Sequence, residues 1–127
     1  MNDEIQSLKD HLIEGMSRYM TYGGAEDETD PDYDPDFDAG YTQGHVDQVE
    51  GILDSYLADV ERAEGDDAAI LAAVQTAVLA LNELNDSADG NLIETDQREQ
   101  LCEIIGSAAR EAGLQTEDDV TEEWREW

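Results

Sequence analysis

Four segments of the chain repeat apolar residues at spacings of three and four, and this pattern constrains the fold more than any other feature. Such spacing gives an α-helix one apolar face, which has to be buried against a neighbour. Glycines follow the first, second and fourth stripes, and Asp66 stands where a cap is expected before the third. The stripes cover residues 3–21, 46–60, 70–84 and 101–112, and the fourth helix is expected to begin near Thr95.

A shorter stripe ends the chain, where Val120, Trp124 and Trp127 follow a possible N-cap at Thr116. No segment shows the strict alternation typical of a half-buried strand. We therefore predict an all-α fold, an antiparallel bundle of four amphipathic helices plus a short C-terminal helix. The two tryptophans either dock this last helix onto the core or form an interface with another protein.

The length of 127 residues predicts a single helical domain over residues 1–127, large enough to bury a core without metals or disulfides. Cys102 is the only cysteine, so no intramolecular disulfide can form, which suits a reducing cytoplasm. The first ten residues lack the basic and apolar regions of a signal peptide. The longest apolar run, Ala68 to Leu81, is shorter than the ~20 residues that cross a bilayer. We expect a cytoplasmic protein with no membrane partner.

Charge restricts the partners of this chain. It has 34 acidic and 6 basic residues, for a net charge of −28, and both halves of the sequence are acidic. Such a surface repels nucleic acid and anionic membranes and attracts cationic surfaces, so we expect no direct nucleic-acid binding. A low lysine content with many carboxylates is also typical of proteins adapted to high salt. An ordinary helical domain with that kind of acidity is therefore an alternative.

The acids are densest at residues 22–42, which we predict to be a long, flexible acidic loop between the first two helices. Two prolines and dense like charge oppose both helix and sheet there. The unit Asp-Pro-Asp-Tyr recurs as Asp-Pro-Asp-Phe at residues 34–37. In extended backbone, alternate residues share a face about 6.6–6.8 Å apart, so the aspartates would form a row resembling the phosphates of a nucleic-acid strand. The alternative is a solvated loop whose aromatic side chains fold onto the bundle.

If the row of aspartates faces a partner, its aromatic residues would provide stacking or anchoring contacts. The acidic face of the second helix would extend the contact surface. The predicted partner-binding residues are Asp30, Asp32, Tyr33, Asp34, Asp36, Phe37, Asp38 and Tyr41 in the loop, and Asp47, Glu50 and Asp54 on the second helix.

A second candidate site is the segment Asn85–Asp96, with the sequence NDSADGNLIETD. It resembles the calcium loop of an EF-hand, with Gly90 at the turn and Leu92 at the apolar position. The resemblance implies calcium ligands at Asn85, Ser87, Asp89, Asn91 and Asp96. The chain would then be a calcium-responsive helical protein. The alternative, which we favour, is a metal-free helix–helix turn in which Gly90 supplies a positive φ.

The sequence lacks the catalytic and nucleotide-binding motifs G-x-S-x-G, G-x-G-x-x-G, H-E-x-x-H and the P-loop. We therefore expect a binding protein rather than an enzyme, and no cofactor. In size, helical content and charge the chain resembles two groups: small acidic helical immunity proteins that neutralise nuclease toxins, and phage and bacterial DNA mimics. The resemblance implies an inhibitor that occludes a basic protein surface. The expected partner is a nuclease toxin or another nucleic-acid-binding protein. The oligomeric state is left open.

Overall fold

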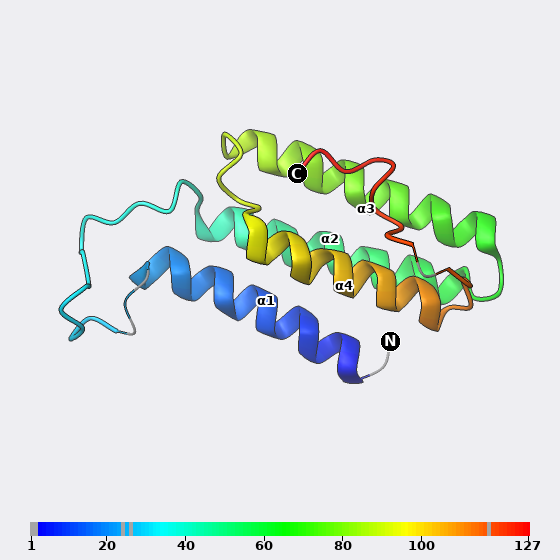
Figure 1. The fold of residues 1–127 in the computed structure, drawn as a ribbon, viewed down its shortest axis with the longest axis horizontal. Helices are drawn as coiled ribbons and strands as arrows, with labels where there is room; N and C mark the ends of the chain where they lie inside the picture. The colour runs from blue at the N-terminus through cyan, green and yellow to red at the C-terminus, as the bar shows by residue number, and fades with distance from the viewer. Residues whose placement is uncertain (1–2, 24, 26, 117) are drawn as a thin grey trace.

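The computed structural model describes residues 3–23, 25, 27–116 and 118–127, and these residues form four α-helices. The helices are α1 (Asp3–Tyr22), α2 (Gln43–Arg62), α3 (Asp67–Ser87) and α4 (Thr95–Glu111). Successive helices run in opposite directions along one long axis (Figure 1). None of the described residues lies in a strand. The prediction of an all-α helical bundle is confirmed.

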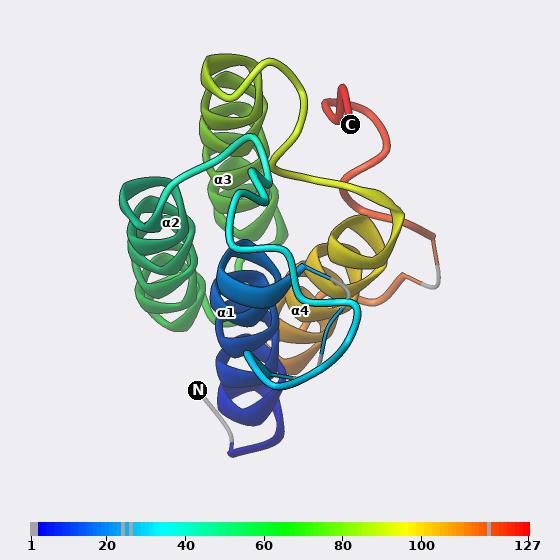
Figure 2. The ribbon, with the colours of Figure 1, turned by 90° about the vertical axis from the view of Figure 1, so that its left-hand side faces the viewer.

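The four predicted apolar stripes form the core of the bundle. Leu12, Val46, Val74 and Leu101, one from each helix, are completely buried. Burying one such side chain stabilises the fold by roughly 1.5–3 kcal/mol relative to leaving it exposed. α1 and α3 each pack against α2 and α4, as Figure 2 shows from the end of the bundle. The core therefore lies between all four helices.

Polar residues and glycines beside the helices set where the helices begin and end. Asp66 caps α3, because its Oδ1 accepts a hydrogen bond from the Ala69 backbone N–H at 3.2 Å. Gly65, with a φ of +81°, makes the turn from α2 and donates its N–H to Ala112 O at 2.9 Å. This bond ties the α2–α3 turn to the end of α4. α4 begins at Thr95, as predicted, and its N-cap is Glu94.

The predicted short C-terminal helix is not present in the described residues 118–127, which form one turn and otherwise irregular backbone. The reason is local competition for the backbone donors. Asp119 Oδ1 accepts both the Thr121 N–H (2.9 Å) and the Thr121 hydroxyl (2.5 Å). Trp124 and Trp127 nevertheless pack against the core, which agrees with the docking interpretation of the two tryptophans.

α3 is longer than the apolar run seen in the sequence. By length and composition it could cross a bilayer, and 44% of its most apolar 18-residue window is buried inside the protein. A core helix of a helical bundle meets the same criterion. The side of α3 that faces α2 and α4 belongs to the core, whereas its opposite side is exposed.

Candidate functional site at the acidic end of the bundle

Residues 23–42, which we call the acidic connection, join α1 to α2, and their described part projects beyond the end of α1 (Figure 1). The described part is a succession of turns. Asp30 Oδ1 accepts the Asp32 N–H at 2.9 Å, and the Tyr33 N–H closes the turn on Asp30 O, also at 2.9 Å. Aspartate first and proline second is the residue order that a type I turn favours.

The second copy of the repeat makes the same turn. Asp34 Oδ1 accepts the Asp36 N–H at 2.9 Å, and the Phe37 N–H donates to Asp34 O at 3.1 Å. The repeated unit is therefore a repeated turn, and the prediction of an extended row of alternating aspartates is wrong. In each turn the first aspartate side chain accepts the backbone N–H two residues later, and an extended strand would hold these two groups apart.

The turns divide the aspartates into two sets. Asp30, Asp34 and Asp38 each accept a backbone N–H two residues later; for Asp38 the donor is Gly40, at 2.8 Å. Asp32 and Asp36 sit inside the turns with exposed side chains. Asp27 caps the preceding turn, and its hydrogen bonds from the hydroxyl and N–H of Thr29 lower the pKa of its carboxyl group. The carboxylates are thus held on a hydrogen-bonded backbone.

The aromatic residues of the acidic connection fold onto the bundle. The Phe37 ring packs edge-on against the Tyr19 ring, with ring centroids 5.3 Å apart. The ring centroids of Tyr33 and Tyr22 are 6.1 Å apart. A Cβ at Gly23 would meet the Phe37 ring at 3.3 Å, so glycine permits this close approach as well as the φ of +61°. Phe37 and Tyr33 are half-buried. This is the arrangement expected from the solvated-loop alternative.

Tyr41 lies in the core rather than on the surface. Its side chain is 7% exposed, and its hydroxyl donates a hydrogen bond to Met16 O at 2.9 Å. Burial raises the pKa of the Tyr41 hydroxyl to about 12. Tyr41 is therefore a structural anchor of the acidic connection, and it also lines the recess at the start of α4.

A recess of about 440 Å³ lies where the acidic connection meets the start of α4. Its lining includes Tyr19, which is 44% exposed, and the carboxyl-bearing residues Glu94 and Asp96. An aromatic ring beside carboxylates suits a guanidinium or ammonium group. This recess could not be predicted from the sequence, because its walls come from three segments that are distant along the chain.

The predicted acids of α2 have different environments. Asp47 is exposed and accepts a hydrogen bond from Gln43 Nε2 at 2.9 Å, while Glu50 is half-buried. Asp54 is paired within the fold, because the buried Lys9 ammonium donates to its Oδ1 at 2.5 Å. This hydrogen bond raises the pKa of Lys9. Asp47 is therefore the α2 acid that best continues the exposed negative surface of the acidic connection.

The segment Asn85–Asp96 is a helix–helix turn, and two of its five predicted calcium ligands already bond within the fold. Asn85 is buried, and its Oδ1 accepts the Ile93 N–H at 2.9 Å. Ser87 Oγ donates to Leu84 O at 2.6 Å, and Gly90 has a φ of +79°. The remaining predicted ligands, Asp89, Asn91 and Asp96, are exposed. Within the described part of the chain, no three His, Cys, Asp or Glu side chains gather where they could hold a metal ion.

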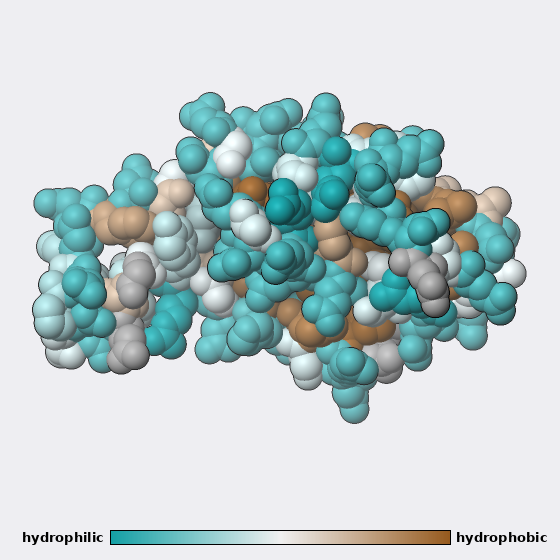
Figure 3. Space-filling model, viewed as in Figure 1, coloured by the Kyte–Doolittle hydropathy of each residue, from teal (hydrophilic) through white to brown (hydrophobic). Residues whose placement is uncertain are grey.

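The side of the molecule that carries α1, α4 and the C-terminal segment is mostly hydrophilic, including the projecting acidic connection (Figure 3). Apolar side chains show there only as patches between polar ones. A search of protein-family models, curated proteins and solved structures found no match to this chain.

Proposed function

We propose that this protein binds and occludes a basic protein surface, and that its partner is a nuclease toxin or another nucleic-acid-binding protein. The observation that carries this proposal is the acidic connection, whose exposed carboxylates are fixed by turns and docked aromatic rings in a chain of net charge −28. A surface that binds nucleic acid is cationic, so it complements this end of the bundle.

Charge acts first on the rate of encounter. Opposite charge can raise association toward 10⁸–10⁹ M⁻¹s⁻¹ at low salt, against roughly 10⁵–10⁶ M⁻¹s⁻¹ for neutral pairs. The turns then matter, because ordering a flexible backbone costs about 1–2 kcal/mol per residue. Since Asp30 and Asp34 already hold their turns closed, less of that cost falls on binding.

The recess beside Tyr19 provides short-range contacts that Tyr33 and Phe37 of the connection do not. A lysine or arginine side chain of the partner fits between Tyr19 and the carboxylates of Glu94 and Asp96. Desolvated contacts of this kind slow dissociation, whereas exposed rim charges such as those of Asp32 and Asp36 act mainly on association. The two groups of residues therefore have separable kinetic effects.

The experiment compares wild type with the double variant Asp32→Asn/Asp36→Asn, using immobilised protein and a nucleic-acid-free extract of the source cell. An unrelated protein of equal net charge serves as the control surface. We expect one or a few basic proteins to be retained by the wild type specifically, and to be displaced by duplex DNA. For the purified partner, the double variant should slow association severalfold and leave dissociation nearly unchanged.

Two results would remove the basis of this proposal. One is retention equal to that on the acidic control protein, which would favour the alternative of acidity suited to high salt. The other is an affinity that does not change between low and high salt, because electrostatic steering requires salt dependence. Salt should in addition stabilise the free protein, since it screens repulsion among the carboxylates.

A further inference from the structure

A groove runs along the outer side of α2 and α3, away from the acidic connection's turns. Its main part has a volume of about 540 Å³ and is lined by Gly51, Ile52 and Ser55 of α2 and by Ala73, Ala77 and Ala80 of α3. Recesses of about 320 and 300 Å³ share lining residues with its two ends. In Figure 2, α2 and α3 lie side by side at the edge of the bundle, and no other helix covers their outer side.

Small side chains, among them Gly51, Ser55 and three alanines of α3, leave much of the groove open. Glycine and alanine let the two helices approach closely but leave the outer side of the contact unfilled. On α3 the recesses extend from Ala69 to Ser87, which is about 27 Å at 1.5 Å per residue. That length matches an α-helix of about 18 residues.

The groove is also unusual in charge. No charged residue occurs on α3 between Ala68 and Asn82, although the chain as a whole is 31% charged. Leu79, on the same turn as Ala80, is 44% exposed. Charged residues appear only at the edges: Asp47 and Asp59 belong to the lining, Glu83 lines the recess at one end, and Arg62, paired with Asp59, lines the recess at the other.

We propose that this groove binds an amphipathic α-helix of the basic partner, with the apolar face of that helix against the alanines and its flanking Lys or Arg residues on the acidic edges. The inference rests on the proposed function for the sign of the partner's charge. The apolar floor selects the helix face, and Asp47, Asp59 and Glu83 select its cationic flanks. Asp59 already pairs with Arg62, but exposed pairs of this kind are weak and exchange readily. A second copy of this chain would bring like charges together at the same edges.

Gly51 offers a variant that fills the groove without disturbing the fold. Nothing lies within 4 Å of a Cβ placed at Gly51, and glycine is a poor residue for the interior of a helix. Gly51→Leu should therefore keep or raise the melting temperature while its side chain occupies the groove. Gly15 of α1 is the matched control, because it is helical, exposed and equally free of neighbours, and it does not line the groove.

The probe is a fluorescent synthetic peptide of 18 residues with leucines along one helical face and lysines and arginines at its flanks. A peptide of the same composition, scrambled to remove the apolar face, has the same charge. By fluorescence anisotropy we expect wild type and Gly15→Leu to bind the amphipathic peptide at least tenfold more tightly than the scrambled one. Gly51→Leu should lose at least that tenfold preference.

Equal binding of both peptides, unaffected by Gly51→Leu, would overturn the groove while leaving charge-based binding in place. A wild-type dimer that Gly51→Leu converts to a monomer in sedimentation would also overturn it, because a second copy would then be the occupant. The proposed function fails on different data, namely the capture experiment and the salt dependence of association. The Asp32→Asn/Asp36→Asn variant, whose residues do not line the groove, should keep its preference for the amphipathic peptide.

Discussion

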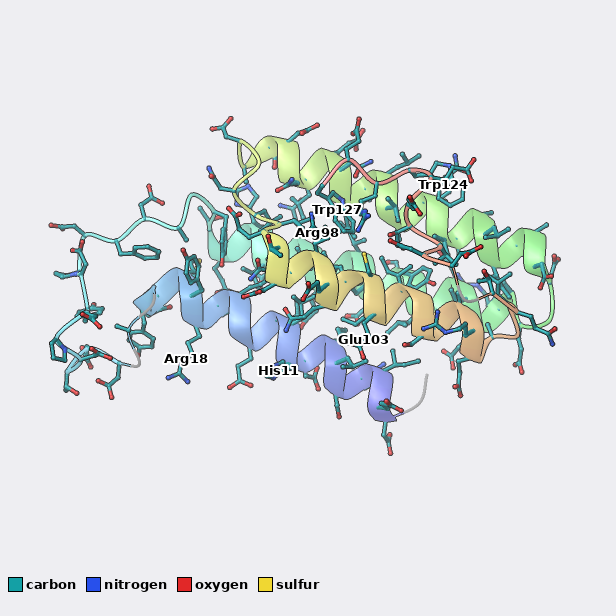
Figure 4. All side chains as sticks on the ribbon, viewed as in Figure 1. His11, Arg18, Arg98, Glu103, Trp124 and Trp127 are labelled. Atoms are coloured by element: carbon teal, nitrogen blue, oxygen red, sulfur yellow. The ribbon has the colours of Figure 1, made fainter. Side chains whose placement is uncertain are left out.

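Replacing Asn82 with alanine should release the C-terminal segment from the bundle. Asn82 is buried on α3, with 4% of its surface exposed. Its Nδ2 donates to Trp124 O at 2.8 Å, and its Oδ1 accepts the Glu126 N–H at 3.1 Å. One side chain thus replaces the hydrogen bonds that a helix would have given this segment. Figure 4 shows where Trp124 and Trp127 lie relative to α3 and α4.

The hydrogen bonds of Asn82 supply part of the free energy that docks this segment, beside the packing of the two tryptophans against the core. Each hydrogen bond of Asn82 contributes about 1 kcal/mol net, so Asn82→Ala removes about 2 kcal/mol. The buried Nε1 of Trp127 has no hydrogen-bond partner in the described part of the chain, which opposes docking by roughly 1–3 kcal/mol. Arg125 compensates in part, since it donates to Cys102 Sγ at 3.1 Å and lies 5.6 Å from the Trp127 ring centroid. Loss of Asn82 should therefore tip the balance toward the undocked state.

Tryptophan fluorescence measures this directly, because the chain has only two tryptophans and both lie in the segment. We expect a red-shifted emission for Asn82→Ala while the far-ultraviolet circular dichroism stays helical. The loss of about 2 kcal/mol should lower the melting temperature by roughly 7 °C for a domain of this size. Gln75→Ala, an exposed change on the same helix, should alter neither signal.

The reasoning fails if Asn82→Ala melts at a lower temperature with an unchanged emission spectrum. Asn82 would then stabilise the core without holding the C-terminal segment. Unchanged stability together with unchanged emission would mean that the apolar contacts of the two tryptophans hold the segment alone.

Three further outcomes test other parts of the structure. Asp34→Ala should increase protease cleavage within residues 27–41 more than Asp36→Ala does, because both remove one charge but only Asp34 caps its turn; equal cleavage would contradict the repeated turn. Burial raises the Tyr41 pKa from 10.0 to about 12, so the contribution of this hydroxyl to the free energy of unfolding is fully present below pH 10 and is lost as the pH rises toward 12. Tyr41→Phe should lower the free energy of unfolding by about 1 kcal/mol at pH 7 and lessen that alkaline loss in denaturant titrations. Asn85→Ala should destabilise the fold by about 1–3 kcal/mol, since it leaves the buried Ile93 N–H without its acceptor, and calorimetry should detect no sub-micromolar calcium site in the wild type.

The helices could be predicted because their signal is local and repeated. Residues such as Leu12, Val46 and Leu101 recur at helical spacing. Burying this apolar face against the other helices stabilises each helix, whatever the exact packing. The C-terminal helix failed because its pattern was short. Because a helix there would have had few turns, the Asp119 carboxylate could accept the Thr121 N–H and hydroxyl instead.

The turns of the acidic connection were predictable from a signal that the alternating pattern concealed. An aspartate followed by proline, as at Asp30 and Asp34, favours a turn more strongly than alternation favours an extended strand. The core position of Tyr41 had no such signal. Its hydroxyl bonds Met16 O, 25 residues earlier in the sequence, and only the packing of α1 against α2 brings the two together.

The distribution of charge bears on the alternative of acidity suited to high salt. A surface acidified only for solubility would carry carboxylates wherever side chains are exposed. Instead, the exposed side of α3 from Ala68 to Asn82 has none, and Leu79 is exposed within it. Eight of the 34 acidic residues lie in the acidic connection, and Asp47 and Glu83 lie at the groove edges. An apolar floor with acidic edges is the kind of surface that the proposed binding of a basic amphipathic helix would use.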